Sequence, residues 1–542
     1  MDDDHISDLP IFILHDILSR LPEKDATRTS VLSKAWWSTF PILSFFYNRR
    51  VGKASKTTEE GFFMKRKNFG DNLKKTLLRF RDQGLAIKEF KLSVNFHDLY
   101  YNSRDVDLWL KLAGESGVEV LHLDLPDRAE DEWEGQDLGY VLPTSVLEAK
   151  SLKMMHLIGG IHIDQAFMNH SIKFFSLRKL LLWYVLVEDE QVIENLISRC
   201  PLIEYISLFC GSVLNPGGGA EGLLNSLSMR GLLKLKKVDI IGIQEVYIDS
   251  PSLENLYYRA VNFDTTCKLE FERCKNLKSL HLGHFKSTVI TQKWFIELFL
   301  KFHFLEILKL DNCTMSERIC ISSDKLTVLM LSKCSNLKEV IIDAPNLSSC
   351  QYVGHGAPKP IISFLRSSSQ LEVNVEMYLD HLDLSDLREF IQNFKPQNVL
   401  ASLSLSIDQS IVDEFNPVVL QDSSSPPIIK HLKLQCVPEN ETLFRPVVNS
   451  LLSSCCPETI LLCFVSFYCS RAFIEFFYET LMGRKEKDCF CCSGSAKCWW
   501  HGLKGVQVTN SRNADENVDF KTMLDALPTC GDFSDIIFRL EL

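Results

Sequence analysis

Residues 277–282 read Leu-Lys-Ser-Leu-His-Leu, and this frame, L-x-x-L-x-L, decides the fold. In a strand, successive side chains point to opposite faces, so Leu280 and Leu282 share one face. One strand of this length cannot cover those leucines. Stacking many such strands in parallel buries them in a continuous ladder, which requires that the frame recur along the chain.

The frame recurs in apolar form between residues 87 and 434, and from Leu152 to Leu326 its first positions are 18 to 32 residues apart. Spacings of about 20 to 29 residues are typical of leucine-rich repeats, in which each strand is followed by a loop, turn or helix on the outer side. We therefore expect an α/β solenoid with parallel strands on its concave face. The predicted frames are Ile87/Phe90/Leu92, Val118/Leu121/Leu123, Leu152/Met155/Leu157, Leu177/Leu180/Leu182, Ile203/Ile206/Leu208, Leu235/Val238/Ile240, Leu253/Leu256/Tyr258, Leu277/Leu280/Leu282, Leu305/Leu308/Leu310, Leu326/Leu329/Leu331, Leu337/Val340/Ile342, Leu400/Leu403/Leu405 and Ile429/Leu432/Leu434.

The array is irregular. Leu326, Leu337 and Leu347 are only 11 and 10 residues apart, too close to hold a strand and a returning helix, so some connections must be simple turns. Three cysteines follow an apolar strand residue by three positions, where leucine-rich repeats carry Asn or Cys inside the turn. We expect these thiols, Cys274, Cys313 and Cys334, to be packing residues.

The N-terminal region has a helical pattern instead. Asp8 and Pro10 can begin a helix that runs to about Arg20, and Pro22 ends it. Apolar residues recur every three or four positions, which gathers them on one stripe. A unit of about 40 residues buries proportionately little surface, so we expect it to pack against something else.

The string DLPIFILHDILSRLPEKDATRTSVLSKAWWSTF resembles the F-box, in the form typical of plant F-box/LRR-repeat proteins. The F-box docks on the Skp-type adaptor of a cullin-RING ubiquitin ligase. One departure is Ala35, where that family usually has Arg. The resemblance implies an adaptor-binding face that consists of Leu9, Pro10, Leu14, Ile17, Leu18, Leu21, Pro22, Val31, Leu32 and Trp36.

The predicted domains are an F-box at 5–46, a linker and amphipathic helix at 47–86, leucine-rich repeats at 87–436 and a C-terminal repeat or capping region at 437–542. Within the last, KCWWHGLKGVQV resembles the closing segment of the plant family, an end strand of the array. In each repeat, the residue between the fourth and sixth positions points away from the core, toward a partner. Target-binding candidates at this position are His122, His156, Tyr257, His281, Lys309 and Lys433.

The F-box resemblance implies a substrate-recognition subunit of an SCF-type E3 ubiquitin ligase, which performs no bond-making chemistry and needs no cofactor. The alternative is a leucine-rich-repeat scaffold whose F-box no longer docks, a possibility that Ala35 keeps open. A formal charge of −11 disfavours a general nucleic-acid or anionic-membrane binder.

The longest uncharged stretch, Thr459–Ser470, is shorter than the roughly 20 residues of a membrane span, and the acidic start MDDDHISD is unlike a secretory signal. We expect a cytoplasmic or nuclear protein whose 18 cysteines are thiols or metal ligands before disulfides.

Three other patterns leave a choice. Cys489, Cys491, Cys492, Cys498 and His501 could bind zinc, but their spacing lacks a paired C-x-x-C, so we favour incidental thiols and predict no metal. The glycine-rich 215–222 has no phosphate-binding context and reads as a loop. The run at 65–67 is read as a solvated basic patch, with a nuclear import signal as the alternative.

Overall fold

The protein divides into two compact units, Met1–Leu277 and Lys278–Leu542, in a computed structural model of the full chain. The structure describes residues 9–30, 36, 38–47, 59–94, 103–125, 140–164, 174–187, 189–209, 212–214, 220–260, 267–285, 288–355, 360–379, 387–395, 400–407, 426–437, 440–464, 471–483, 499–510, 520–525 and 534–541.

Two prolines begin the first two helices, α1 (Ile11–Arg20) and α2 (Glu23–Ser30). The carbonyl of Pro10 accepts hydrogen bonds from the N–H groups of residues 13 and 14, and the carbonyl of Pro22 accepts from those of residues 25 and 26. Proline is tolerated here because the residue just before a helix contributes its carbonyl, and not its N–H, to the helix. The expected cap, Asp8, lies outside the described residues.

The first unit contains one large parallel sheet, here called its main sheet. Its spatial order is β1-β2-β3-β5-β7-β9-β13-β15, and every pairing is parallel. The first strand lies at the end of the region predicted to be F-box, and it pairs directly with β2. The strands are β1 (Ile42–Tyr47), β2 (Glu89–Val94), β3 (Val120–Leu125), β5 (Met154–Gly159), β7 (Lys179–Trp183), β9 (Tyr205–Phe209), β13 (Lys237–Ile241) and β15 (Asn255–Arg259).

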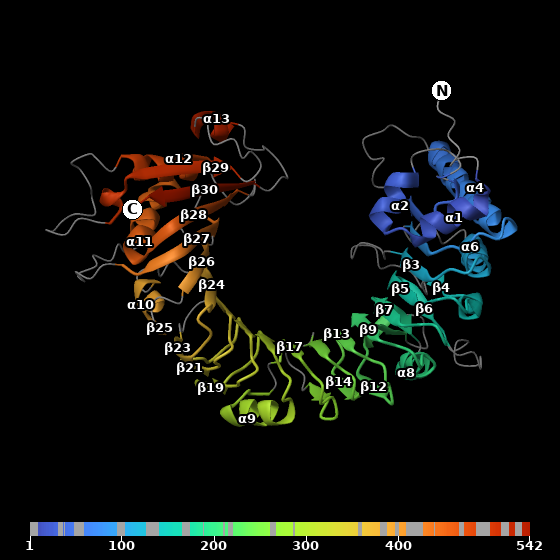
Figure 1. The fold of residues 1–542 in the computed structure, drawn as a ribbon, viewed down its shortest axis with the longest axis horizontal. Coiled ribbons are helices and arrows are strands. Elements are labelled where there is room, and N and C mark those ends of the chain that lie inside the picture. Colours follow the sequence, from blue (N-terminus) through green and yellow to red (C-terminus); the bar gives the residue numbers. More distant parts are fainter. Residues whose placement is uncertain are drawn as a thin grey trace. The chain divides into compact units, whose positions relative to one another are not determined.

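An outer layer covers one face of this sheet. Figure 1 shows β3, β5, β7 and β9 side by side, with α6 and α8 on one side of them. The layer also contains two small sheets, of order β11-β10-β8-β6-β4 and β12-β14-β16. Its elements are α4 (Glu59–Asp82), α6 (Ser103–Glu115), η3 (Thr144–Glu148), α8 (Glu190–Ser198), β4 (Tyr140–Val141), β6 (Ile161–Ile163), β8 (Leu186–Val187), β10 (Ser212–Leu214), β11 (Ala220–Leu223), β12 (Ser226–Arg230), β14 (Glu245–Asp249) and β16 (Lys268–Glu270).

The predicted leucine ladder forms the core between the two layers. Paired strands keep the fourth frame position in register, for example Leu180 opposite Ile206 and Ile206 opposite Val238. All three are fully buried, as are the frame leucines of the second unit. The opposite face of the main sheet carries the half-exposed residues, and we call it the open face.

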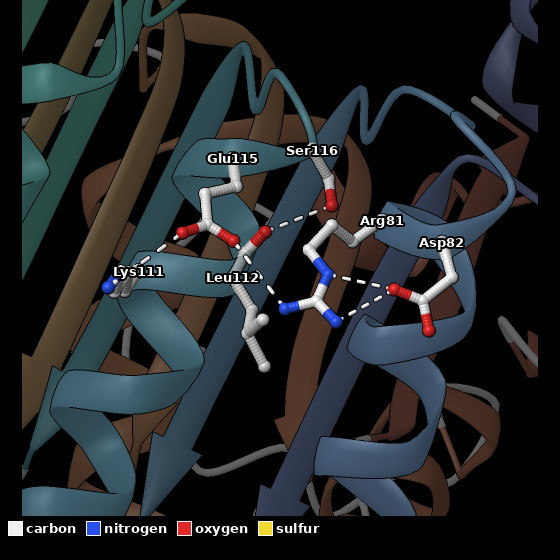
Figure 2. Close-up of polar contacts among 6 residues, drawn as sticks. All are labelled: Arg81, Asp82, Lys111, Leu112, Glu115 and Ser116. Carbon is white, nitrogen blue, oxygen red and sulfur yellow. Dashed lines mark hydrogen bonds and ion pairs between the residues drawn. The ribbon is translucent and has the colours of Figure 1, made fainter.

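Charged side chains join the outer-layer helices α4 and α6 where both end. Arg81 donates to the carboxylate of Asp82 at 2.7 and 2.9 Å, and its third nitrogen lies 3.8 Å from Glu115 (Figure 2). Lys111 approaches the same Glu115 at 3.9 Å. These groups are largely exposed, so each pair contributes only about 0–1 kcal/mol, and the buried leucines hold the layer in place.

Helix α8 protects the exposed edge of the small sheet β12-β14-β16. Glu190 accepts hydrogen bonds from the backbone N–H groups of Asn225 and Ser226 at 2.8 and 3.3 Å. Glu194 accepts from the N–H of Ser228 at 2.6 Å. An unpaired strand edge is a template for pairing with other chains, and these carboxylates occupy it.

The second unit repeats the architecture. Its main sheet runs β17-β18-β20-β22-β24-β26-β27-β28 in parallel and ends with β30 and β29, both antiparallel to their neighbours. The segment predicted as an end strand is thus β29 (Gly505–Asn510), last in the order. The other strands are β17 (Ser279–Gly283), β18 (Ile307–Asp311), β20 (Val328–Ser332), β22 (Ser349–His355), β24 (Glu372–Leu379), β26 (Leu400–Ile407), β27 (Ile428–Cys436), β28 (Cys456–Phe464) and β30 (Ser534–Glu541).

A second sheet, β19-β21-β23-β25, lies in the outer layer of this unit, and it corrects one predicted frame. Leu337/Val340/Ile342 belongs to β21, an outer strand. The frames at Leu326, Leu337 and Leu347 are so close together that consecutive strands join the main sheet and the outer sheet in turn. The remaining elements are β19 (Arg318–Ser322), β21 (Glu339–Asp343), β23 (Ile361–Arg366), β25 (Phe394–Lys395), α9 (Gln292–Lys301), α10 (Leu387–Gln392), α11 (Glu441–Ser454), α12 (Arg471–Met482), η6 (Trp499–Gly502) and α13 (Phe520–Asp525).

Main-sheet strands of both units end in the same turn. Tyr184, His284, Asn312 and Lys333 directly follow their strands and all have positive φ, between 49° and 59°. This conformation turns each N–H toward the next repeat, where it donates to a strand-end carbonyl at 2.6 to 2.8 Å. A left-handed residue other than Gly costs about 1–2 kcal/mol, which the gained hydrogen bond and packing offset.

The three predicted turn cysteines pack as expected. Cys274 and Cys313 are buried, and Cys334 is half-buried. Their thiols lie within 3.5 to 3.7 Å of strand carbonyls of the preceding repeat. Among the described residues, no helix is long and apolar enough to span a membrane.

Candidate functional site

The N-terminal helical module has its own small core. Leu14, Leu18, Ala26 and Trp36 are buried against one another. Leu14, Leu18 and Trp36 were predicted to form the docking face, but in this structure they are at most 4% exposed and fill the interior. An amphipathic stripe marks the buried side of a helix, so these residues support the module and do not present a surface.

Ile17 and Leu21, also predicted to dock, are half-buried and pack against this core. The two remaining candidates in the second helical run, Val31 and Leu32, lie outside the described residues, as does Ala35.

An exposed apolar patch lies at the start of α1. It consists of Leu9, Pro10, Ile11 and Phe12, with Leu9 36%, Ile11 41% and Phe12 64% exposed. Sequence reasoning chose Leu9 and Pro10 but missed Ile11 and Phe12. Phe12 lies off the stripe that fills the core, and a large apolar residue outside that stripe was the available signal. Ile11 lies three positions before Leu14, in the first turn of the helix, and is exposed there. Pro22 is also exposed.

The module is attached to the first repeats through α1. Nε2 of His15 lies 2.7 Å from the carbonyl oxygen of Ala86, and the imidazole contacts Phe80 of α4 edge-on. Nζ of Lys88 donates to the carbonyl of Ser19, at the other end of α1, at 3.3 Å. Because β1 follows the module and pairs with β2, the module is fixed to the first repeats both through α1 and through the main sheet.

A hydrogen-bonded row crosses the open face of the first unit. Oε1 of Glu89 lies 3.0 Å from Nε2 of His122, whose Nδ1 is 3.1 Å from Nδ1 of His156. The Glu89 carboxylate also pairs with Lys91 at 3.0 Å. The hydrogen bond from His122 lowers the pKa of Glu89 despite its partial burial.

The second histidine of this row is held neutral. Burial, and then the neighbouring His122, lower the pKa of His156 to about 4. Its ring meets Trp183 edge-on at 4.5 Å. The structure therefore brings the candidates His122 and His156 together with an indole that sequence reasoning did not select.

A second polar group lies further along the same face. The hydroxyl of Tyr205 donates to Asp239 at 2.6 Å, and Lys237 pairs with the same carboxylate at 3.0 Å. Burial and the bond to Asp239 raise the pKa of Tyr205. Tyr257, a predicted target-binding residue, is half-exposed in β15 and pairs in register with Asp239.

The second unit holds the other three candidates. His281 and Lys309 are register neighbours in β17 and β18, and both are half-exposed on the open face. Lys433 lies in β27, in register with Ser404. His281 and Lys309 are thus side by side, whereas several strands separate them from Lys433.

No cluster of three or more potential metal ligands occurs among the described residues. The candidate zinc thiols Cys489, Cys491, Cys492 and Cys498 lie outside them, as does most of the glycine-rich loop. The basic run at 65–67 lies in α4, with Lys65 and Lys67 exposed.

Comparison with known proteins gives three family-model matches. An F-box domain matches residues 6–39. The leucine-rich repeats described for the FBD-associated F-box protein At5g56370 match residues 106–260, and the LRR domain of At1g61320/AtMIF1 matches residues 248–425.

The names of several relatives from Arabidopsis thaliana contain the same domains. The F-box/FBD/LRR-repeat protein At1g13570 is 33% identical over 38% of this chain and 44% of its own length. The F-box/FBD/LRR-repeat protein At3g52680 is 29% identical over 39% and 41%. The FBD-associated F-box protein At3g52670 is 26% identical over 61% and 73%. The match thus spans less than half the length of the first two relatives.

The helical module and the stacked parallel strands define a protein built from an F-box and leucine-rich repeats. Its matched domains and its Arabidopsis relatives are those of plant F-box/LRR-repeat proteins. This architecture is typical of non-catalytic adaptors, and an F-box domain in general implies binding of a Skp-type adaptor.

Proposed function

We propose that this chain is the substrate-recognition subunit of an SCF-type, cullin-RING E3 ubiquitin ligase and has no catalytic activity of its own. In this proposal the F-box binds the Skp-type adaptor, and the open face of the repeats binds a target protein. The observation that carries it is the exposed patch Leu9, Pro10, Ile11 and Phe12 at the start of an otherwise well-packed module.

The patch has the chemistry of a binding surface. Large apolar side chains that remain exposed together, beside a packed core, are a common mark of protein–protein contact. Phe12 is the most exposed of the four, and a buried aromatic anchor is a frequent source of binding energy. The core residues Leu14, Leu18 and Trp36 would then support the patch from below.

The attachment of the module supports the mechanism. A ligase receptor acts by proximity: it holds a target near the ubiquitin-loaded enzyme and so raises the effective concentration of the reacting groups. A flexible connection between the F-box and the repeats would let the target adopt many positions and would lower the effective concentration at the productive one. The contacts of His15 with Ala86 and Phe80 limit the motion of the F-box relative to the first repeats.

The first experiment measures binding of the purified full chain to a Skp-type adaptor. We expect Phe12→Ala, and the pair Leu9→Ala with Pro10→Ala, to weaken binding about tenfold or more, the effect of a lost anchor. Arg20→Ala is the matched control, because Arg20 is exposed at the far end of the same helix. If the intact chain does not bind the adaptor, the proposal fails and the scaffold interpretation replaces it.

The second experiment asks whether bound targets are ubiquitinated. Proteins held by the full chain are compared with those held by a chain that lacks residues 1–40, which keeps Pro41 and β1 to complete the main sheet. We expect shared targets to accumulate with the shortened chain and to be ubiquitinated only with the full chain. Equal ubiquitination with both chains would contradict the proposal.

The compartment is also a proposal. We propose the cytoplasm, the nucleus or both. Ten cysteines among the described residues are free thiols, as is usual in a reducing compartment. Fluorescence imaging of the tagged full chain tests it, and a secretory or membrane distribution would contradict it.

A further inference from the structure

A second row of side chains crosses the open face of the first unit, two residues further along each strand than the row that contains the histidines. Strand register sets Ile158 of β5 beside Trp183 of β7, Trp183 beside Phe209 of β9, and Phe209 beside Ile241 of β13. All four keep part of their surface exposed. We call these four residues the apolar row.

The centre of the apolar row is held in a fixed geometry. The rings of Trp183 and Phe209 stack with centroids 4.8 Å apart and an interplanar angle of 10°. Nε1 of Trp183 donates to Oγ of the buried Ser207 at 3.0 Å, and the ring of His156 packs on the other side. A partner that binds here would not have to order the indole, which lowers the entropic cost of binding.

The two ends of the apolar row carry opposite charges. Asp124 of β3 is in register with Ile158, and its carboxylate accepts a hydrogen bond from Ser93 at 2.9 Å. Arg259 of β15 is in register with Ile241 at the other end. A segment that lies along the row therefore meets an acidic group at one end and a basic group at the other.

The spacing of the row selects the backbone conformation of the partner. Neighbouring strands are about 4.8 Å apart, so the four side chains repeat at that interval over ~14 Å. A helix presents apolar side chains on one face every three or four residues, at intervals of about 4.5–6 Å. An extended strand presents them every ~6.7 Å, which does not match the row.

We propose that the apolar row binds an amphipathic α-helix of a partner protein, laid across β5, β7, β9 and β13. The helix carries apolar residues near positions i, i+3, i+7 and i+10, a Lys or Arg at the Asp124 end and an Asp or Glu at the Arg259 end. The identification of that partner as the ligase target rests on the proposed function. The helix-binding property itself does not.

The test uses two displayed libraries of ~16-residue peptides, about four helical turns long. Both have the same composition: one places apolar residues at the helical period above, and the other places them at alternate positions. Selection is made on the full chain. We expect the helical library to be enriched, with a basic residue at one end. Enrichment of the alternating library, or of neither library, would overturn the proposal.

Variants locate the site. Trp183→Ala and Phe209→Ala should each weaken the selected peptides about tenfold or more. Lys179→Ala, at the other end of the same strand β7, is the matched control and should leave binding unchanged. Asp124→Lys should invert the preference from a basic to an acidic terminal residue. Equal binding by the wild type, Trp183→Ala and Phe209→Ala would place the peptides elsewhere and overturn the assignment.

The outcome is separable from that of the proposed function. Trp183→Ala should retain binding to the Skp-type adaptor, which also shows that the chain is folded. If the intact chain binds selected helices but no adaptor, the ligase proposal fails and the helix-binding surface stands. If the intact chain binds the adaptor but no selected helix, the helix-binding proposal fails and the ligase proposal stands.

Discussion

Nδ1 of His122 lies 3.1 Å from Nδ1 of His156 on adjacent strands of the open face. Because a carboxylate only accepts, the bond to Glu89 assigns the proton of His122 to Nε2, so His156 donates from Nδ1. Nε2 of His156 is buried and has no hydrogen-bond partner among the described residues, so a second proton on that ring would be left unsatisfied.

Stability should therefore fall in mild acid. The pKa of His156 is lowered from 6.5 to about 4, so below pH 6.5 the unfolded chain binds a proton that the folded chain does not. The free energy of unfolding therefore has its full value above about pH 6.5 and decreases as the pH falls toward 4. Urea denaturation between pH 7.5 and 4.5 measures it. His156→Gln should reduce the slope, and the exposed control His303→Gln should not; an unchanged slope for His156→Gln would refute the assignment.

Core and patch variants of the F-box should behave differently. Leu18→Ala removes a fully buried side chain and should cost about 2–5 kcal/mol of stability in the module. Phe12→Ala changes an exposed side chain and should stay within about 0.5 kcal/mol. Hydrogen exchange of α1 and α2 distinguishes the two. Comparable loss of protection in both variants would mean that Phe12 is part of the fold and not of a binding surface.

Loosening the module should separate binding from transfer. His15→Ala removes the contacts with Ala86 and Phe80 but none of the exposed patch. We expect adaptor affinity to be retained while ubiquitination of a bound target becomes slower. Hydrogen exchange of α1 should increase in parallel. The same ubiquitination rate in His15→Ala and wild type would show that the attachment does not matter for transfer.

The edge of the small outer sheet gives a fourth prediction. Glu190→Ala with Glu194→Ala leaves the N–H groups of residues 225, 226 and 228 without their carboxylate partners. We expect faster amide exchange at these positions, a stability loss of about 1–3 kcal/mol and more self-association. Light scattering and hydrogen exchange measure it. Glu297→Ala, which changes an exposed side chain of α9 in the second unit, serves as a surface control.

The repeat array could be predicted because its signal is burial. A strand with one covered face must alternate apolar and polar residues. Leu277, Leu280, Leu282 and their equivalents follow this alternation, and all lie in the core. The sequence pattern did not predict which of the two sheets a strand joins. Leu337/Val340/Ile342 fits the same frame but lies in the outer layer, because an outer strand also has one covered face.

The candidate sites were predictable only in part. An apolar stripe on a helix indicates its buried side, so choosing Leu14, Leu18 and Trp36 as a docking face selected the interior. Phe12, off the stripe, was missed. On the open face, reasoning from the position between two core leucines found His122 and His156 but not the next outward position, where Trp183 and Phe209 lie.

The strand β1 directly follows the F-box and begins the main sheet. Every later strand of the main sheet is therefore a whole number of ~4.8 Å steps from the F-box module. Inserting or deleting one whole repeat between β1 and β5 would move whatever is held at Trp183 by one such step. Under the proposed ligase function, the lysine of the bound target that is modified would then change with repeat number, even though no contacting residue had been altered.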